Sequence, residues 1–305
     1  VVDNVDELRL LDELARKQGK MANILFRIKP GVDAHTHEYI LTGQIDSKFG
    51  MALENGEAFE IVKEALKYDN ISVKGIHCHI GSQIFETEPM AQAAAKMIEF
   101  MAVVRDKLGC EMGELNMGGG FGIKYTDKDT PKSPEENIAS LAKAIKEASE
   151  KYDIIRPRVI IEPGRCIVGP AGITVYTVGS VKTIPNVRTY VSVDGGMTDN
   201  PRYALYEAEY EILNPECPLD EKTMICALAG RNCESGDLIG KEMKVQTLKT
   251  GDYVAVLTTG AYNYSMASNY NRVPRPPIVM ITQNGEDKLV VKREDYDDLI
   301  KNDIL

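Results

Sequence analysis

The sequence predicts an α/β protein in which a parallel barrel or doubly wound sheet is followed by a β-rich domain. In the first half of the chain, short apolar strands alternate with helical segments, which is the βα pattern of both architectures. After about Gly172, short β-rich runs separated by turns replace the long helices. We therefore expect a β/α domain over residues 1–172 and a β-domain over residues 173–305.

Composition limits the class of protein and its partners. The 305 residues carry a formal net charge of -10, which disfavours a nucleic-acid partner because phosphate groups repel an acidic surface. No apolar run approaches the ~20 residues that a membrane-spanning helix needs. Six cysteines occur without a C-x-x-C pair, a pattern typical of free thiols in the reducing cytoplasm. We expect a cytoplasmic protein whose ligands are small molecules.

Helical and strand periodicities define the first half of the chain. Leu8, Leu11 and Leu14 repeat with a helical period, and Gly19 stands where that helix would end. Helices are expected over 6–18, 56–68, 88–108 and 135–152, and strands over 24–28, 73–80, 114–117 and 158–161. Val1 and Val2 resemble the end of one more strand, which gives five of the eight strands that a closed barrel requires.

The second half is predicted to be built from short strands. They are expected over 175–178, 189–193, 224–228, 253–257 and 278–281. Turns separate them and no long helix intervenes, so this part reads as a separate β-domain.

The glycine-rich segment Gly118–Gly122 is the first candidate for ligand binding. Four of its five residues are glycine, and it directly follows a predicted strand. Without Cβ atoms, backbone amides can turn inward and hold an anion such as a phosphate group. Most glycine-rich turns are simply tight loops, so this segment gains weight from three other strand-end motifs, around His77, Glu162 and Cys233.

Two of these motifs place ionisable groups at strand ends. His77 and His79 share one face of their predicted strand because strand side chains alternate. Such a pair fits a zinc site, two structural histidines, or one ring stacked on an aromatic cofactor, and the pair alone favours the structural alternative. Glu162 ends an apolar strand and precedes Pro-Gly-Arg. Its carboxylate needs a protonated ring nitrogen or a cation opposite it, or it forms a structural ion pair with Arg165.

The second half carries further candidate side chains. Cys233 and Glu234 precede a Ser-Gly-Asp turn that would present a thiol and a carboxylate, although an ordinary surface turn is the commoner alternative. Arg202 and Tyr206 are four residues apart, on one face if the segment is helical, and an arginine fork suits a carboxylate. Tyr262 follows a strand and begins a run of polar groups too dense for core packing.

In their order along the chain, five motifs resemble those of the alanine-racemase-like, fold type III PLP-dependent decarboxylases. They are His77-Cys78-His79-Ile80-Gly81-Ser82-Gln83, Gly118-Gly119-Gly120-Phe121-Gly122, Glu162-Pro163-Gly164-Arg165, Cys233-Glu234-Ser235-Gly236-Asp237 and Gly260-Ala261-Tyr262. The Cys233 motif, together with Ser265-Met266-Ala267-Ser268-Asn269-Tyr270-Asn271, is most similar to the branch of the family that decarboxylates diaminopimelate. The resemblance spans nearly all of the chain.

The resemblance implies a (β/α)8 barrel of the TIM type that binds pyridoxal 5'-phosphate (PLP), followed by the β-domain, in a homodimer with shared active sites. It implies decarboxylation of meso-2,6-diaminopimelate to L-lysine and CO2, a step of lysine biosynthesis. Decarboxylation of another basic amino acid, such as ornithine or lysine, is the alternative activity.

The resemblance also implies roles for individual residues. His79 stacks on the pyridine ring of PLP, and Glu162 keeps the ring nitrogen protonated, which makes the ring an effective electron sink. The residues that hold the phosphate are Ser82, Gly118, Gly119, Gly120, Gly164 and Tyr262, and Arg165 lies beside them. The residues that bind carboxylate groups of the substrate are Arg165, Arg202 and Tyr206, with Tyr262 adjacent. Glu234 accepts the distal ammonium, and Cys233, offered from the partner subunit, protonates the carbon that loses CO2.

Two features depart from the family pattern. Tyr203 stands where the family usually has proline. The lysine that carries PLP belongs to a Tyr-Ala-x-Lys motif in the family's first barrel strand, and no such motif occurs in these 305 residues. We therefore expect the chain to be part of a longer protein, with Lys29 and Lys48 as the alternative lysines within it.

Two rival functions remain open at this point. The first is a metal-dependent barrel hydrolase that uses His77 and His79, and the density of glycine at the expected phosphate site favours PLP over it. The second is a non-catalytic relative that acts as a binding partner. Cys233, Glu234 and Arg165 favour catalysis, because a binding module needs no proton donor.

Overall fold

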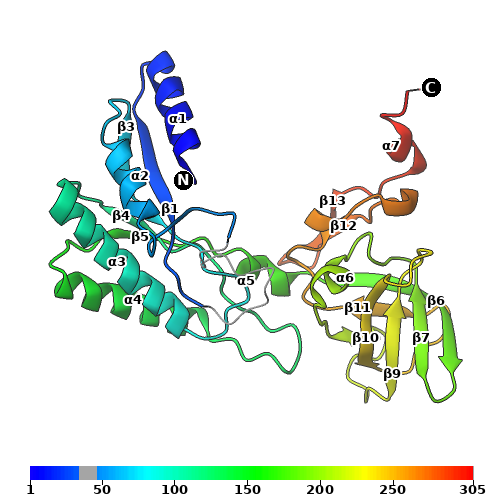
Figure 1. Ribbon diagram of the computed structural model, residues 1–305. Helices are drawn as coiled ribbons and strands as arrows, with labels where there is room; N and C mark the ends of the chain where they lie inside the picture. Colours follow the sequence, from blue (N-terminus) through cyan, green and yellow to red (C-terminus); the bar gives the residue numbers. More distant parts are fainter. Residues whose placement is uncertain (34–46, 305) are drawn as a thin grey trace. The chain divides into compact units, whose positions relative to one another are not determined.

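The computed structural model describes residues 1–33 and 47–304, which form two compact units (Figure 1). The first, called here the β/α unit, comprises Val1–Ile123 and Thr130–Cys166. The second, the β-unit, comprises Lys124–Asp129 and Ile167–Leu305. Each unit has its own sheet and is described by itself.

The β/α unit is built on a parallel sheet with helices between its strands. The strands are β1 (Ala22–Lys29), β2 (Met51–Ala52), β3 (Ile71–His77), β4 (Glu114–Asn116) and β5 (Arg158–Ile160). They pair in the order β2-β1-β3-β4-β5, and Val2 adds one parallel bridge to Phe26. The helices are α1 (Val5–Gln18), α2 (Glu57–Ala65), α3 (Glu88–Leu108) and α4 (Pro134–Lys151). This arrangement confirms the predicted parallel β/α architecture.

Local signals in the sequence set the ends of these helices. The Asn4 side chain accepts hydrogen bonds from the amides of Asp6 and Glu7 at the start of α1, and Gly19 ends that helix with a φ of 61°. At the start of α4, Ser133 and Glu136 form a reciprocal capping box. These caps satisfy amides and carbonyls that a helix leaves unpaired at its ends.

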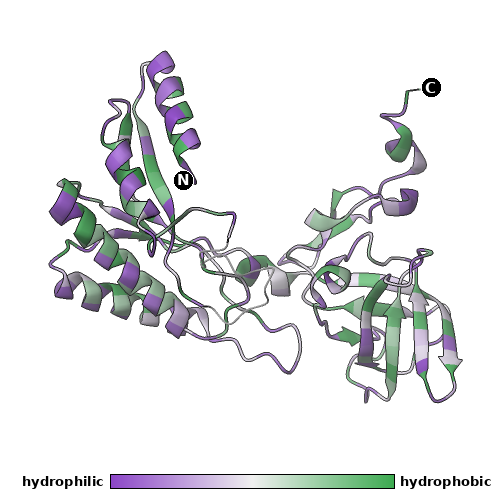
Figure 2. Cartoon of the chain, viewed as in Figure 1, coloured by the Kyte–Doolittle hydropathy of each residue, from purple (hydrophilic) through white to green (hydrophobic). Residues whose placement is uncertain are grey.

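Apolar side chains from the strands and helices form one core in the β/α unit. Phe26 and Ile28 from β1 and Leu115 from β4 are almost completely buried, as are Met97 and Met101 from α3. Figure 2 shows hydrophobic and hydrophilic residues on different sides of α3 and α4, as expected for helices with one face against neighbouring elements. The helices α3 and α4 pack side by side. Burial of the apolar faces of these helices stabilises the sheet and so holds the ends of its strands in place.

The β-unit contains a mainly antiparallel six-stranded sheet and a separate hairpin. The sheet strands are β6 (Thr174–Ile184), β7 (Arg188–Val193), β8 (Ile212–Leu213), β9 (Met224–Ala229), β10 (Leu238–Val245) and β11 (Tyr253–Val256), in the order β10-β9-β7-β6-β11-β8. The hairpin is β12 (Ile278–Ile281) with β13 (Asp287–Val291). Its short helices are α6 (Arg202–Tyr206) and α7 (Tyr296–Ile300), with 3-10 turns at Gly169–Ala171, Tyr264–Met266 and Tyr270–Arg272, and α5 (Arg165–Val168) joins the two units in the chain.

The structure differs from the sequence prediction in several strands. Strands β2, β8, β10 and β13 were not predicted, and the strand expected over 73–80 ends at His77. Strand β10 contains Gly240, and its pairing with β9 has two irregularities, so its sequence lacks a clean alternation of apolar residues. Strands β2 and β8 have two residues each, too few to show any period.

Within the described part of the chain, no helix has both the length and the apolar composition to cross a bilayer.

Candidate active site

The segments that follow β3, β4 and β5 lie against one another and form what we call the strand-end cluster, residues 77–83, 116–120 and 162–165. Backbone hydrogen bonds continue past the ends of the strands. The Cys78 amide donates to the Asn116 carbonyl at 2.8 Å, and the Glu162 amide donates to the Gly118 carbonyl at 2.7 Å. The predicted histidine, glycine and glutamate motifs therefore meet at the carboxyl edge of the sheet, where parallel β/α proteins bind ligands.

The glycines of this cluster allow neighbouring backbones to come close. A Cβ at Gly119 would lie 2.3 Å from the Glu162 carbonyl oxygen, and a Cβ at Gly120 would lie 2.3 Å from the Gly81 carbonyl oxygen. The Gly118 amide already donates to Asn116 Oδ1 at 2.9 Å, and the Gly119 amide donates to His79 Nδ1 at 3.3 Å. The Gly120 amide donates to no residue in the described ranges, which leaves it for a ligand.

Glu162 presents a carboxylate at the end of β5. Asn116 Nδ2 donates to Glu162 Oε1 at 2.8 Å, and His77 Nε2 lies 3.7 Å from Glu162 Oε2. The Glu162 side chain is 52% exposed, and in the described structure it contacts these two residues rather than forming an ion pair with Arg165. Its orientation is therefore fixed from one side while the other side stays accessible to a ligand.

Asn116 was not singled out from the sequence. It is 4% exposed and both ends of its amide are used, by Glu162 and by the Gly118 amide. The available signal was a polar residue inside the apolar strand Leu115-Asn116-Met117, since a buried amide needs hydrogen-bond partners.

Burial keeps both histidines of the cluster neutral. It lowers the pKa of His77 to about 4, and it also lowers the pKa of His79, assisted by the positive charge of Arg27. His79 Nδ1 accepts from the Gly119 amide, so its ring proton is on Nε2. His77 and His79 have different neighbours, Glu162 and Gly119, and a neutral ring such as that of His79 suits stacking on an aromatic cofactor.

Arg165 and Ser82 complete the cluster. Arg165 is 8% exposed, and its Nη2 donates to Ser82 Oγ at 2.8 Å. A Cβ at Gly164 would meet only open space, so the backbone there is accessible to a ligand. The guanidinium, the hydroxyl and the Gly120 amide are donors suited to a phosphate group. Together with the Glu162 carboxylate, which suits a protonated ring nitrogen, these residues fit PLP.

In the β-unit, Arg202 lies among three aromatic rings, an arrangement that we call the arginine–tyrosine cluster. Arg202 Cζ lies 5.4 Å from the ring centre of Tyr125, 6.0 Å from that of Tyr206 and 5.9 Å from that of Tyr262. Arg202 Nη1 donates to Tyr125 Oη at 3.3 Å, and Arg202 Nε is buried without a partner in the described residues. A buried guanidinium with an unused donor is suited to a carboxylate ligand.

This cluster contains three predicted residues, Arg202, Tyr206 and Tyr262, and one that the sequence did not indicate, Tyr125. Helix α6 places Arg202 and Tyr206 one turn apart, as their spacing predicted. Tyr125 reaches Arg202 from a distant loop, and nothing in its local sequence marked it.

Tyr262 has a strained backbone for a residue with a side chain. Its φ is 63°, a left-handed conformation that is uncommon outside glycine. Nearby, a Cβ at Gly260 would lie 1.8 Å from the Val168 carbonyl oxygen, so the chain passes close to its neighbour before it turns. Such strain persists only where surrounding contacts enforce it, and it is concentrated at functional sites.

Cys233 and Glu234 lie in the turn between β9 and β10, and both are exposed. Tyr270 Oη donates to Glu234 Oε2 at 3.3 Å. By contrast, burial raises the pKa of Cys78 to about 12 and that of Cys226 to about 11, so those thiols stay protonated and inert. Cys233 is the accessible thiol that the sequence singled out.

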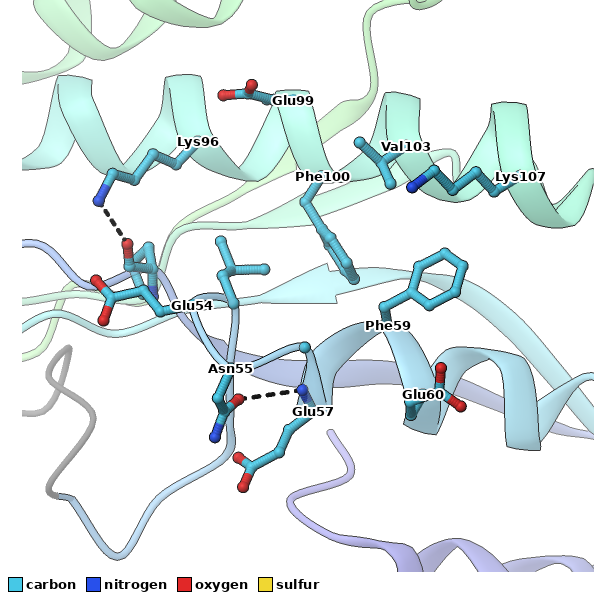
Figure 3. Close-up of a pocket in the computed structure, with 13 residues that line it drawn as sticks. Glu54, Asn55, Glu57, Phe59, Glu60, Lys96, Glu99, Phe100, Val103 and Lys107 are labelled. Carbon is cyan, nitrogen blue, oxygen red and sulfur yellow. Dashed lines mark hydrogen bonds between the residues drawn. The ribbon is translucent and has the colours of Figure 1, made fainter.

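A cavity of about 820 Å³ lies between α2 and α3, away from the predicted site residues (Figure 3). Phe59 from α2 and Phe100 from α3 extend into the space between the helices, and Lys96 closes one end by donating to the Pro30 and Gly31 carbonyls at 2.9 Å. None of the residues predicted to bind a ligand lines this cavity.

Comparison with known proteins matches both units. Residues 1–169 match the family described as "Pyridoxal-dependent decarboxylase, pyridoxal binding domain". Diaminopimelate decarboxylase of Bacillus subtilis is 47% identical over 304 residues, which cover 100% of this chain and 69% of that protein.

Solved structures agree with this match. The diaminopimelate decarboxylase of M. jannaschii in complex with L-lysine superposes with a TM-score of 0.91 at 36% identity, over 100% of this chain and 68% of that one. A lysine/ornithine decarboxylase from Vibrio vulnificus bound to putrescine is less similar, with a TM-score of 0.69 and 25% identity over 88% of this chain and 65% of its own. The chain therefore belongs to the pyridoxal-dependent decarboxylases and, within them, to the diaminopimelate decarboxylase family.

Proposed function

We propose that the chain catalyses the PLP-dependent decarboxylation of meso-2,6-diaminopimelate to L-lysine and CO2, a step of lysine biosynthesis. The observation that carries this proposal is the buried Arg202 with its unused Nε donor. The distal end of diaminopimelate carries a carboxylate, which lysine and ornithine lack. A guanidinium held by tyrosine side chains suits that group.

The strand-end cluster would hold the cofactor. Bound PLP supplies an electron sink for the electrons released when CO2 departs. The Glu162 carboxylate, oriented by Asn116, keeps a proton on the ring nitrogen, and the neutral His79 ring stacks on the pyridine. The phosphate is held by Ser82, Gly118, Gly119, Gly120, Gly164 and Arg165, with Tyr262. In this group the Gly120 amide and the Ser82 and Arg165 side chains act as donors, while Gly118 and Gly119 shape the backbone.

The substrate would be held at both ends. Arg165 and Arg202 bind its two carboxylates, with the rings of Tyr206 and Tyr262 beside Arg202. The Glu234 carboxylate accepts the distal ammonium group. The Cys233 thiol gives a proton to the carbon that has lost CO2, which makes it the general acid of the reaction.

We also propose that the enzyme acts in the cytoplasm as a homodimer in which Cys233 and Glu234 serve the partner's active site. The functional division would then lie near residue 172, with the barrel domain before it and the β-domain after it. Exposure of Cys233 and Glu234 supports this arrangement, since their side chains are accessible to a second subunit. Six free cysteines agree with a reducing compartment.

A substrate panel tests the proposed function. The full-length holoenzyme is assayed for CO2 release from meso-diaminopimelate, L-lysine and L-ornithine under the same conditions. We expect kcat/KM for diaminopimelate to exceed the other two by about a hundredfold or more, because loss of a charged, hydrogen-bonded partner costs about 2–5 kcal/mol. Faster turnover of ornithine or lysine would contradict the proposal and indicate a decarboxylase of basic amino acids.

A further inference from the structure

Asp237, at the end of the Cys233–Asp237 motif, has contacts unlike those of a surface turn residue. It is 3% exposed, and its carboxylate accepts three hydrogen bonds. Oδ1 accepts from the Met197 amide at 2.6 Å, and Oδ2 accepts from both the backbone amide and the side-chain Nδ2 of Asn232 at 2.8 Å. One buried carboxylate thus joins two segments that are distant in sequence.

Two glycines make room for this carboxylate. A Cβ at Gly196 would lie 2.4 Å from Asp237 Oδ1, and a Cβ at Gly230 would lie 2.2 Å from the same atom. Gly196 also has a φ of 151°, which residues with side chains rarely adopt. The chain therefore fits closely around Asp237 from both segments.

Asp237 also closes, through its backbone, the turn that carries Cys233 and Glu234, residues 230–237, which we call the Cys233 turn. The Gly230 amide donates to the Asp237 carbonyl at 2.8 Å, and the Asp237 amide donates to the Glu234 carbonyl at 3.0 Å. With the Asn232 amide bound to the Asp237 side chain, the turn is fixed at both ends and in its middle.

The second segment leads to Arg202. The Arg231 amide donates to the Gly195 carbonyl at 3.1 Å, which adds a second link beside Asp237–Met197. From there the Asn200 amide donates to the Gly196 carbonyl at 2.9 Å, just before α6 begins at Arg202. Asp237 therefore connects the Cys233 turn with the segment that positions Arg202.

We propose that Asp237 is a positioning residue that fixes the direction of the Cys233 thiol and the Glu234 carboxylate on the β-unit, so that both groups are aimed at the partner's active site. The proposal rests on the roles proposed above for Cys233 and Glu234. It assigns to Asp237 no contact with substrate or cofactor. Its effect on catalysis passes through the Met197 and Asn232 amides.

The substitution Asp237→Asn isolates this role. An amide has one acceptor oxygen, so it can keep the Asn232 contacts but turns its NH2 group toward the Met197 amide. The shape of the side chain is preserved while the bond from the Met197 amide is lost, and the backbone link between Arg231 and Gly195 remains. Asp252→Asn is the matched control, because Asp252 is also buried at 8% exposure and accepts from the Lys249 amide at 2.9 Å in another turn of the β-unit.

Hydrogen exchange tests the geometric part of the proposal without any assay of activity. Peptides that cover residues 195–199 and 230–237 should exchange about tenfold or more faster in Asp237→Asn, the scale for a lost hydrogen bond to a charged group. The same peptides should be unchanged in Asp252→Asn. Unchanged exchange in Asp237→Asn would overturn the proposal.

Product analysis of the holoenzyme tests the catalytic part. Cys233→Ala should slow turnover by about a hundredfold, the scale for a lost general acid, and should release CO2 without an equal amount of lysine. Asp237→Asn should also lower the ratio of lysine to CO2 below one, because a misdirected thiol no longer delivers its proton to the right carbon. A loss of folded enzyme would lower the rate but not this ratio.

The outcomes separate the two proposals. A ratio of one in Asp237→Asn, with faster exchange, would contradict the positioning role and leave Asp237 as a structural residue. Wild-type rate and ratio in Cys233→Ala would instead contradict the proton-donor role of the thiol. A lowered ratio in both variants, with the Asp252→Asn control unchanged, supports the positioning role.

Discussion

The protonation of His77 illustrates how single residues set the electrostatics of the strand-end cluster. Burial lowers the pKa of His77 in the folded protein to about 4, below the ordinary value of 6.5, and the residue is only 4% exposed. A folded-state pKa below the unfolded one means that the unfolded chain binds the proton more readily. Above pH 6.5, His77 therefore adds no pH dependence to the free energy of unfolding. As the pH falls from 6.5 toward 4, protonation of His77 in the unfolded chain lowers the stability of the fold.

We predict that His77→Gln removes this part of the pH dependence. The difference between the two pKa values corresponds to about 3 kcal/mol as an upper value. Urea unfolding of wild type and variant at pH 7.5 and pH 4.5 measures it. The wild type should lose more free energy of unfolding between the two pH values than the variant does, and equal losses would contradict the assignment.

Residues of the site differed in how well the sequence revealed them. Glu162 and Arg165 belong to a contiguous motif, and their chemistry was readable because it depends on residue type at a strand end. Asn116 and Tyr125 were missed because their roles depend on contacts with residues far away in sequence. No local pattern encodes such contacts, so they follow only from the fold.

At the scale of elements, the glycine turn after β4 combines close backbone packing with the proposed binding of the phosphate group. We predict that Gly119→Ala separates the segments after β4 and β5, because the new Cβ would lie 2.3 Å from the Glu162 carbonyl oxygen. Overpacking of this kind costs about 1–3 kcal/mol. Thermal unfolding and titration with PLP should show lower stability and weaker cofactor binding.

Gly113→Ala is the matched control for that substitution. Gly113 lies just before β4, and a Cβ there would meet no atom within 4 Å. It should leave cofactor affinity unchanged. Equal effects of the two alanines on PLP binding would show that the close approach at Gly119 does not shape the site.

The prediction of secondary structure succeeded where a periodic pattern of apolar residues extended over many residues. It failed where the pattern covered only a few residues. The long helix expected over 88–108 agrees with α3 at both ends, because about six turns of apolar periodicity leave little ambiguity. Strand β3 ends at His77, earlier than expected, because the bond from the Cys78 amide to the Asn116 carbonyl is its last backbone hydrogen bond to β4. Strand β13 was missed, and most of its residues are exposed, so it has no apolar face to reveal it.

At the scale of the whole molecule, the proposed sharing of active sites between two subunits can be tested by mixing two inactive variants. Arg165→Ala and Cys233→Ala would each inactivate the enzyme, the first through its strand-end cluster and the second through its exposed turn. If Cys233 serves the partner's site, mixed dimers contain one intact site. Mixing the two variants after reversible dissociation should restore about a quarter of wild-type activity, the result of random pairing in a two-fold dimer. Failure to recover activity, with mixed dimers present, would contradict sharing.

The family as a whole was readable from the sequence because its motifs retain their order across both units. The chain matches the Bacillus subtilis relative over 100% of its own residues and 69% of that protein. The proposed basis of substrate choice was less accessible, since it rests on how Arg202 is surrounded by Tyr125, Tyr206 and Tyr262. That surrounding is a property of the folded β-unit.

Recognition of the distal carboxylate by Arg202 is the central claim, and two inhibitors that differ at one end test it most directly. L-Lysine, the product, keeps the distal ammonium and carboxylate groups of diaminopimelate, whereas cadaverine keeps the distal ammonium and lacks the carboxylate. Inhibition constants of both are measured against meso-diaminopimelate in the wild-type holoenzyme and in Arg202→Met. The account predicts that the substitution weakens L-lysine by about thirtyfold or more and leaves cadaverine nearly unchanged. Equal weakening of both inhibitors, or of cadaverine alone, would contradict it.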